Sequence, residues 1–317
     1  MGSSPPAPAR PDIHDRAATE RSRGWPERLV LHVGAHKTAS THFQQGLRKG
    51  QEAFRAAGAS VLTRPQLQKR PGQPLGARLG VSFETGRRRR NWRPAILADL
   101  AHGCGRLVLS EENILGQLTG TGGLFEVTLY PEAAQRVATI GASAAPVPLT
   151  LALTVRNPVD YLVSAYSQSL FRGHGGPVEA FVGRLPLLAI DWCDLAGRLL
   201  AVPRVEEIVI WRFEDYPQVA VAAADAIAGT QAADSSWFAH PPLHRGLSVR
   251  AVAAALEAPE GPERAAAAEA ARARYPVGPG NPRLRPYDDE DEALSAEFYD
   301  DQWRRMGDMP GLRRLQP

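Results

Sequence analysis

The chain of 317 residues lacks several features that would assign it to a class at once. Its two cysteines, Cys104 and Cys193, cannot build a disulfide framework and have no metal-ligand spacing, so we expect a reducing compartment and no metal. The longest apolar run, Leu149–Val155, is far too short to cross a bilayer. The net charge is only +3, which gives no general reason to expect nucleic acid as a partner.

Two segments differ in composition from the rest. Residues 1–24 are rich in Pro, Ala, Ser and Arg without an apolar core, which predicts a disordered tail rather than a signal peptide. Residues 25–317 then form a single predicted domain, with an Arg-, Gly- and Pro-rich insertion at about 64–93. Its Arg87–Arg90 run is interpreted as a solvated loop, or else as a patch that recruits an acidic acceptor. Without a leader or anchor, we expect a cytoplasmic protein.

Short apolar segments with long spacers indicate the fold class. The predicted strands are Arg28–Val33, Arg106–Ser110, Leu149–Val155 and Glu207–Trp211. Each spacer is long enough for a crossover helix, which favours an α/β fold with three α/β/α layers around a central parallel sheet. Further helices are predicted at about Glu263–Arg274 and Glu290–Met306.

The loop after the first strand has the composition of an anion site. Gly34 and Lys37 are followed by three hydroxyl residues that open a helix: Thr38, Ser40 and Thr41. Free N–H groups and the dipole at a helix start attract anions, while a lysine there is unfavourable unless an anion binds. The loop is not a Walker A sequence, because Lys37 follows Gly34 by three positions and no second glycine precedes it.

This loop resembles the 5′-phosphosulfate loop of PAPS-dependent sulfotransferases, roughly Gly-x-x-Lys-Thr-Gly-Thr-Thr. The chain departs from that pattern at Ala39, where the family usually has glycine. The resemblance implies that Lys37 contacts the bridging oxygen of the phosphosulfate. It implies that the 5′-phosphate is held by the rest of the loop, which is Thr38, Ala39, Ser40 and Thr41.

A second pattern follows the third predicted strand. Arg156 stands just beyond Val155, and Asn157-Pro158 is a good N-cap and first-turn pair for the next helix. Ser164 and Gln168 lie one turn apart on that helix, off its apolar stripe. An arginine at the strand end and a serine two turns on can converge on one phosphate. The alternative for Arg156 is an ion pair with Asp160.

The separation of Arg156 and Ser164 is similar to that of the sulfotransferase pair that binds the 3′-phosphate of PAPS. Weaker similarities to bacterial, soluble members of that family occur at Ser110–Asn113, Trp211–Asp215 and His244–Ser248. Together the motifs imply the P-loop NTPase-like sulfotransferase fold over about residues 29–248.

Acidic and imidazole side chains near these motifs are candidates for proton transfer. Glu111 and Glu112 follow a strand end, and the family pattern Ser-x-Glu-Asn favours Glu112 as the base. His36 is either a base, a ligand contact or a spacer, whereas His32 lies mid-strand and is interpreted as buried structure.

The resemblance implies transfer of a sulfuryl group from PAPS to a hydroxyl or amine, without a metal. The acceptor is left open among a glycan, a lipid and a small metabolite, and so is the oligomeric state. One alternative is a P-loop-type kinase that uses ATP and Mg²⁺. The other is a catalytically silent protein that binds PAP or PAPS.

Overall fold

A computed structural model describes residues 24–68, 96–116, 118, 128–182, 187–240 and 246–317. The predicted tail, apart from Gly24, and the Arg87–Arg90 run lie outside these residues. In the described part, residues 64–68 of the expected insertion are an ordered helix, α4 (Arg64–Gln68). No helix in these ranges is both long enough and apolar enough to span a membrane.

A six-stranded sheet forms the centre of the molecule, and every neighbouring pair of strands is parallel. The four predicted strands are confirmed, with ends shifted by up to two residues. Two edge strands, β2 and β6, were not predicted, because β2 contains two hydroxyl residues and β6 carries two arginines. In spatial order the strands are β2 (Ala59–Thr63), β3 (Arg106–Ser110), β1 (Arg28–His32), β4 (Leu149–Val155), β5 (Val205–Arg212) and β6 (Leu312–Leu315).

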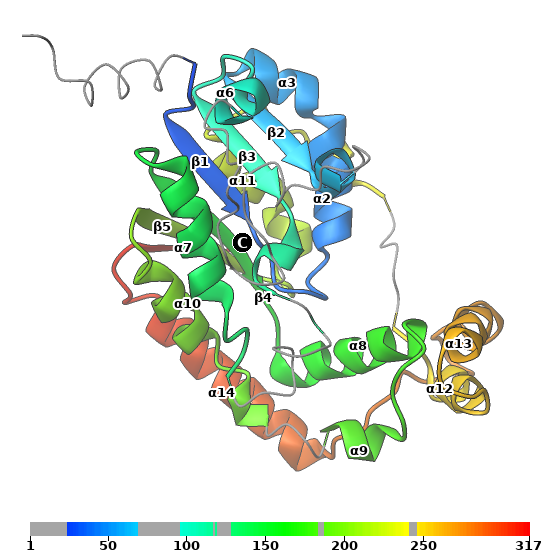
Figure 1. The fold of residues 1–317 in the computed structure, drawn as a ribbon. Helices are drawn as coiled ribbons and strands as arrows, with labels where there is room; N and C mark the ends of the chain where they lie inside the picture. The colour runs from blue at the N-terminus through cyan, green and yellow to red at the C-terminus, as the bar shows by residue number, and fades with distance from the viewer. Residues whose placement is uncertain (1–23, 69–95, 117, 119–127, 183–186, 241–245) are drawn as a thin grey trace, which may run out of the picture.

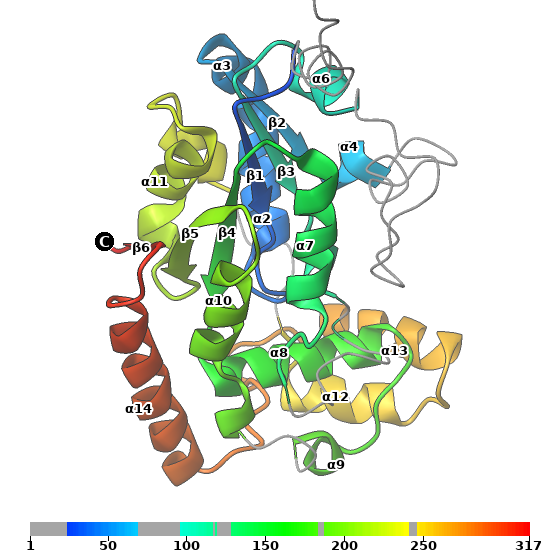
Figure 2. The same cartoon turned by 60° about the vertical axis from the view of Figure 1, so that its left-hand side comes forward.

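Helices cover both faces of this sheet, which confirms the three predicted layers (Figures 1 and 2). Alternate residues of a strand point to opposite faces. Accordingly, Val30 packs in one core cluster with Phe43 and Val219, whereas Leu31 packs in a second cluster with Val137 and Leu195. The first cluster includes residues of α2 (Ser40–Lys49), α3 (Gln51–Ala56) and α11 (Tyr216–Ala228), and the second residues of α7 (Ala133–Ala144), α10 (Trp192–Leu200) and α14 (Asp289–Met306).

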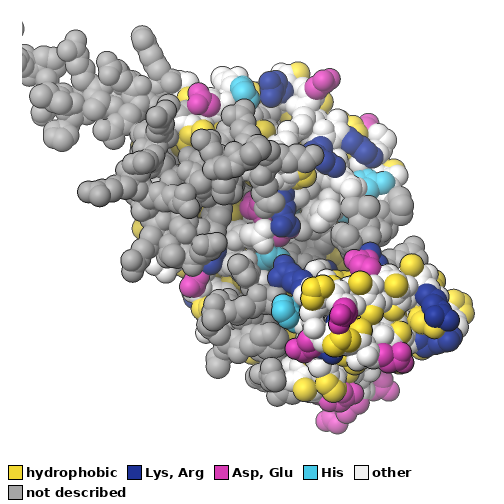
Figure 3. Space-filling view, turned by 45° about the vertical axis from the view of Figure 1, so that its right-hand side comes forward, with side chains coloured by type: hydrophobic (Ala, Val, Ile, Leu, Met, Phe, Trp, Pro, Cys, Tyr) yellow, Lys and Arg dark blue, Asp and Glu magenta, His cyan; other side chains and the backbone are white. Residues whose placement is uncertain are grey.

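The helix after β4 crosses the carboxyl ends of the strands. This helix, α8 (Pro158–Phe171), lies below the sheet in Figures 1 and 2, beside α12 (Val249–Leu256) and α13 (Pro262–Arg274). The space-filling view shows these last two helices as a lobe with apolar, basic and acidic side chains on its surface (Figure 3). Shorter elements complete the description: α6 (Ile96–Ala101), η1 (Glu112–Ile114), α9 (Val178–Val182), η2 (Leu187–Ala189) and η3 (Ser235–Phe238).

The predicted helix after the anion loop is divided into α2 and α3 at Gly50. Its apolar residues Phe43, Leu47 and Phe54 are buried, and two glycines between them allow close packing. A Cβ at Gly46 would stand 2.1 Å from the Phe238 ring, and one at Gly50 would stand 2.2 Å from Trp237. Both glycines are therefore required by the segment that packs on this helix.

Candidate functional site

A cavity of about 580 Å³ opens at the carboxyl ends of the strands, between the β1–α2 loop, η1 and α8. Such crevices are where parallel α/β sheets commonly bind ligands. Most of the predicted site residues line it, whereas Thr38 and Glu111 do not. Those that line it are His36, Lys37, Ala39, Ser40, Thr41, Glu112, Arg156 and Ser164.

The β1–α2 loop is built around three left-handed residues, with φ of 42° at Gly34, 67° at Lys37 and 62° at Ala39. Left-handed residues among ordinary ones turn successive backbone N–H groups toward one concave side, a common anion-binding arrangement. Ala39 is also the N-cap of α2 and makes no side-chain cap. The first N–H groups of α2 have no intrahelical partner, and Ala39, Ser40 and Thr41 line the cavity.

The backbone is left-handed at Ala39, the position where the pattern that this loop resembles usually has glycine. Glycine adopts this conformation freely, whereas alanine pays a steric cost of about 1–2 kcal/mol. Ala39 adopts it nevertheless. The shape of the loop is thus compatible with alanine.

Lys37 extends into the cavity and is only partly exposed. Its Nζ donates to Oε1 of Gln168 at 3.1 Å, so its one hydrogen-bond partner among the described side chains is neutral. Burial lowers the pKa of Lys37 to about 8, and the charge of Arg156 acts in the same direction. A cation held without a counter-ion in this way is a favourable partner for an anion.

Arg156 is joined directly to the loop. Its Nη1 donates to the backbone oxygen of Lys37 at 2.7 Å, and its guanidinium lies over the Phe213 ring, 4.1 Å from the centroid. The arginine is 8% exposed, and its buried Nε has no hydrogen-bond partner among the described residues. Among the described residues no ion pair joins Arg156 to Asp160, whose carboxylate pairs with Arg283 at 2.6 Å. The charge of Asp160 still acts to raise the pKa of Arg156, against the larger effect of burial.

The helix α8 presents Ser164 and Gln168 to the same cavity. As predicted, Asn157 caps this helix, its side chain accepting from the N–H of Val159, and Pro158 begins it. The two site residues lie off the buried stripe, which leaves them available to the cavity wall. The helix therefore connects the Arg156 end of the site to the Lys37 end.

Glu112 is the carboxylate that reaches the cavity. It is 6% exposed, and it accepts from Arg64 Nη1 at 2.7 Å and from Gln44 Nε2 at 3.0 Å. Burial acts to raise the pKa of this carboxyl, but its own backbone N–H and the charge of Arg64 bring it below the ordinary value. Glu112 is therefore ionised at neutral pH.

Glu111 has a structural position instead. Its carboxylate caps η1 by accepting from the backbone N–H of Asn113 at 3.2 Å and from the side-chain amide of Asn113 at 2.7 Å. Burial and the neighbouring charge of Glu112 raise the pKa of Glu111. Its role is to fix the turn that presents Glu112.

Both ring nitrogens of His36 are engaged. Nδ1 lies 2.9 Å from the hydroxyl of Tyr130, and Nε2 lies 3.3 Å from Oδ1 of Asn113. Because the amide oxygen is an acceptor, Nε2 carries the proton and Nδ1 accepts from Tyr130. Burial lowers the pKa of His36 to about 4, so the neutral ring has no lone pair to spare. Its place suits a ligand contact better than a base.

Two further residues noted in the sequence, Thr38 and His32, stabilise the structure around the cavity without lining it. The Thr38 hydroxyl donates to the Ala35 carbonyl at 2.6 Å, so it stabilises the loop rather than extending toward the cavity. His32 is buried as expected, within hydrogen-bond distance of Ser110 at 2.6 Å. Burial lowers its pKa to about 4 as well.

Several lining residues were not predicted, notably Arg64, Arg172, Phe213 and Arg283. Arg64 was assigned to the insertion, and no sequence pattern links it to Glu112. Arg172 had a detectable signal, because it follows Ser164 and Gln168 at intervals of four residues on one helix face. Phe213 lies in the Trp211–Asp215 segment noted in the sequence, directly after β5, but was not itself singled out. Arg283 comes from a loop whose path the sequence does not indicate.

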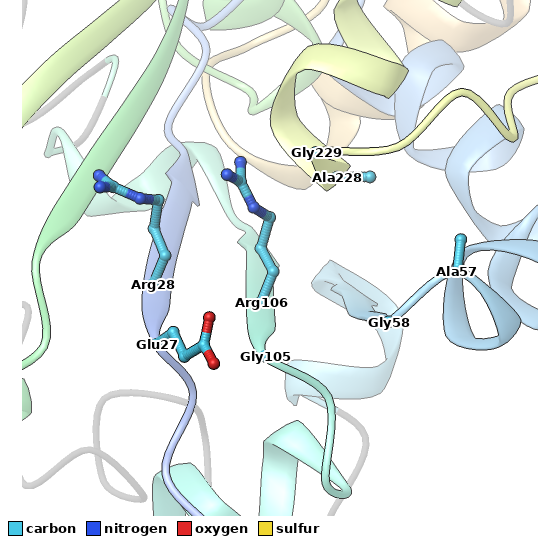
Figure 4. Close-up of a pocket in the computed structure, with 8 residues that line it drawn as sticks. All are labelled: Glu27, Arg28, Ala57, Gly58, Gly105, Arg106, Ala228 and Gly229. Carbon is cyan, nitrogen blue, oxygen red and sulfur yellow. The ribbon is translucent and has the colours of Figure 1, made fainter.

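A smaller hollow of about 320 Å³ lies at the opposite, amino end of the strands (Figure 4). Its arginines are already engaged: Arg28 pairs with Glu206, and Arg106 donates to the last carbonyls of α11. These contacts therefore stabilise the amino ends of β1 and β3. Among the described residues, no group of three or more His, Cys, Asp or Glu side chains is placed to hold a metal ion.

No protein-family model matches this chain, and no curated protein matches it at a significant level. Among solved structures, it is similar to the crystal structure of a sulfotransferase from Alicyclobacillus acidocaldarius. The two share 18% identity over 67% of this chain and 85% of the other, with a TM-score of 0.36. A likeness at this level does not indicate the reaction or its substrates.

Proposed function

We propose that the protein transfers a sulfuryl group from PAPS to a hydroxyl or amine of an acceptor, using a sulfotransferase-like fold. One observation carries the proposal. The two anion-binding elements, 119 residues apart in the sequence, meet through the hydrogen bond from Arg156 to the Lys37 carbonyl and open onto one cavity. A nucleotide with separate 3′ and 5′ anionic groups suits this arrangement.

In this proposal each element binds one end of the nucleotide. The N–H groups of Ala39, Ser40 and Thr41 hold the 5′-phosphate, with the helix dipole of α2 adding to the attraction. Arg156 and Ser164 hold the 3′-phosphate, and the planar guanidinium favours a bidentate contact. Phe213 keeps that guanidinium in place by stacking on it.

The transfer then takes place beside Lys37. The bond between sulfur and the bridging oxygen of PAPS breaks, a bond from sulfur to the acceptor atom forms, and PAP leaves. Lys37 stabilises the negative charge that develops on the bridging oxygen, as cations do in phosphoryl transfer. The carboxylate of Glu112 accepts the proton that the acceptor loses.

Calorimetry with PAP and with ATP–Mg²⁺ tests the nucleotide assignment. We expect wild-type protein to bind PAP with micromolar affinity and ATP–Mg²⁺ at least tenfold more weakly. Binding of ATP–Mg²⁺ in preference to PAP would favour the kinase alternative. If the protein binds neither PAP nor ATP–Mg²⁺, the proposal is refuted.

Glu112→Gln tests the proton acceptor. We expect the variant to keep its affinity for PAP within threefold, because glutamine is nearly isosteric with glutamate and its one side-chain oxygen can still accept from Arg64. We expect sulfation by labelled PAPS to fall about 10²–10⁴-fold across an acceptor panel, the usual contribution of a general base. A wild-type protein that binds PAP but labels no acceptor would instead be a silent binding protein.

A further inference from the structure

The buried hydroxyl of Tyr130 directs most of its hydrogen-bonding capacity at His36. It accepts from the backbone N–H of His36 at 3.1 Å and lies 2.9 Å from Nδ1 of the same residue. A third partner, the hydroxyl of Tyr161, stands at 2.8 Å. A tyrosine hydroxyl has one proton to donate and can also accept, so three partners at these distances use it fully.

The direction of these bonds is fixed from the opposite side of the His36 ring. The amide nitrogen of Asn113 donates to Oε1 of Glu111 at 2.7 Å, so the amide oxygen of Asn113 faces Nε2 of His36 at 3.3 Å. Nε2 therefore carries the ring proton, and Nδ1 accepts the proton of Tyr130. The lone pairs of Tyr130 then accept from the His36 N–H and from the Tyr161 hydroxyl.

The bond to the His36 N–H lies where the β1–α2 loop leaves the sheet. The N–H groups of residues 33–35 donate to backbone carbonyls of β4 at 3.0–3.2 Å. The next N–H along the chain, that of His36, donates to Tyr130 instead. The left-handed residues Lys37 and Ala39 follow, and with them the N–H groups proposed to hold the 5′-phosphate. Tyr130 therefore anchors the loop immediately before its anion-binding part.

The backbone of Tyr130 is itself held in a conformation that a tyrosine rarely adopts. Its φ is 48°, in the left-handed region, and such strain persists only where surrounding contacts fix it. Arg198 of α10 supplies these contacts, because its guanidinium donates to the carbonyls of Leu129 and Tyr130, the latter at 3.0 Å. Asp194, one turn earlier in α10, pairs with Arg198 at 2.8 Å. The position of the Tyr130 hydroxyl is thus fixed by its own backbone.

We infer that Tyr130 is a positioning residue for the 5′-phosphate end of the site, which fixes both the ring and the backbone of His36 and so sets the direction of the loop N–H groups that follow. The inference rests on the proposed function. Tyr130 is 3% exposed and is not a lining residue of the cavity, so it acts through His36. The 3′-phosphate end depends less on this anchor, because Arg156 is also held by the Phe213 ring.

Tyr130→Phe in the full-length protein tests the inference, because it removes the hydroxyl and keeps the ring. Tyr166→Phe is the matched control, since it also removes the hydroxyl of a buried tyrosine, one that donates to the Gly176 carbonyl at 2.8 Å. Calorimetry measures the dissociation constants of adenosine 5′-monophosphate and adenosine 3′-monophosphate. Nitrogen-15 NMR at pH 7 follows the Nδ1 resonance of His36 without nucleotide.

In Tyr130→Phe the affinity for the 5′-monophosphate should fall about fivefold, the order expected from one lost hydrogen bond, and that for the 3′-monophosphate should stay within twofold. The Nδ1 resonance should move downfield, toward that of an imidazole nitrogen that accepts no hydrogen bond. Tyr166→Phe should change neither the affinities nor the resonance. An unchanged resonance, an unchanged affinity for the 5′-monophosphate, or equal losses for both nucleotides would overturn the inference.

A second variant, Arg198→Met, releases the backbone of Tyr130 without removing its hydroxyl. If Tyr130→Phe does not fold, Arg198→Met should show the same selective loss for the 5′-monophosphate, and a loss shared by both nucleotides, or none, would overturn the inference. Failure of wild-type protein to bind PAP would refute the proposed function instead. The Nδ1 resonance needs no nucleotide, so it still decides whether Tyr130 holds His36.

Discussion

Lys37 combines a cost to folding with a proposed role in binding. Its pKa of about 8 in the folded protein is below the value of an unperturbed lysine, so the unfolded chain binds more protons between these two pH values. The charged form therefore destabilises the fold at neutral pH, and stability rises with pH through that window. Folding alone would therefore favour a neutral side chain at this position.

Lys37→Met should accordingly stabilise the protein without ligand while abolishing its function. We expect the free energy of unfolding at pH 7 to rise by about 1–2 kcal/mol, after allowance for the lost Gln168 contact. Sulfation should fall by at least 10³-fold, and PAP should bind at least tenfold more weakly. Denaturant unfolding and calorimetry measure the two effects. A variant that is less stable than wild type would refute the electrostatic account of this residue.

The same pKa sets the alkaline limit of nucleotide binding. Above about pH 8 the free protein loses the Lys37 proton, so PAP affinity should fall as pH rises from 7 to 9.5. His36, with a pKa of about 4, adds no change in that range. Calorimetry across these values checks the prediction, and the alkaline decline should vanish in Lys37→Met. A pH-independent wild-type affinity would contradict it.

At the scale of elements, the strand–loop–helix unit of β1 and α2 was predictable, because its residues act locally. The apolar strand, the loop with Gly34 and the hydroxyl residues follow one another directly in the sequence. The division of the next helix at Gly50 was not predictable, since it depends on Trp237 from a distant segment. Likewise α4 brings Arg64 to Glu112 through a tertiary contact that neither local sequence specifies.

The loop conformation predicts how position 39 tolerates substitution. Ala39→Gly should be neutral or stabilise the protein by up to about 1 kcal/mol, because relief of the left-handed strain offsets the entropy of glycine. Ala39→Val should destabilise it and weaken PAP binding, since a β-branched residue is disfavoured at this φ. Thermal unfolding and calorimetry compare both with wild type. Equal stability of the two variants would argue against the left-handed loop.

At the scale of the whole molecule, parallel pairing explains why distant motifs share one site. β1 and β4 are neighbours with Leu29 opposite Leu149, so the residues that follow each strand emerge at the same edge of the sheet. The sequence could predict this meeting of Lys37 and Arg156 once a parallel sheet was inferred. The arginines contributed by α4 and by the segment before α14 could not be foreseen, because no repeated pattern fixes where those segments pack.

The most direct test of the shared site compares PAP with adenosine 5′-monophosphate, which lacks the 3′-phosphate, by calorimetry on wild type and Arg156→Gln. We predict that wild type binds PAP at least 30-fold more tightly than the monophosphate. The preference should fall below threefold in the variant, while affinity for the monophosphate stays within threefold. A wild-type protein that binds both nucleotides equally, or a variant that keeps the preference, would contradict the assignment of the two elements to one nucleotide.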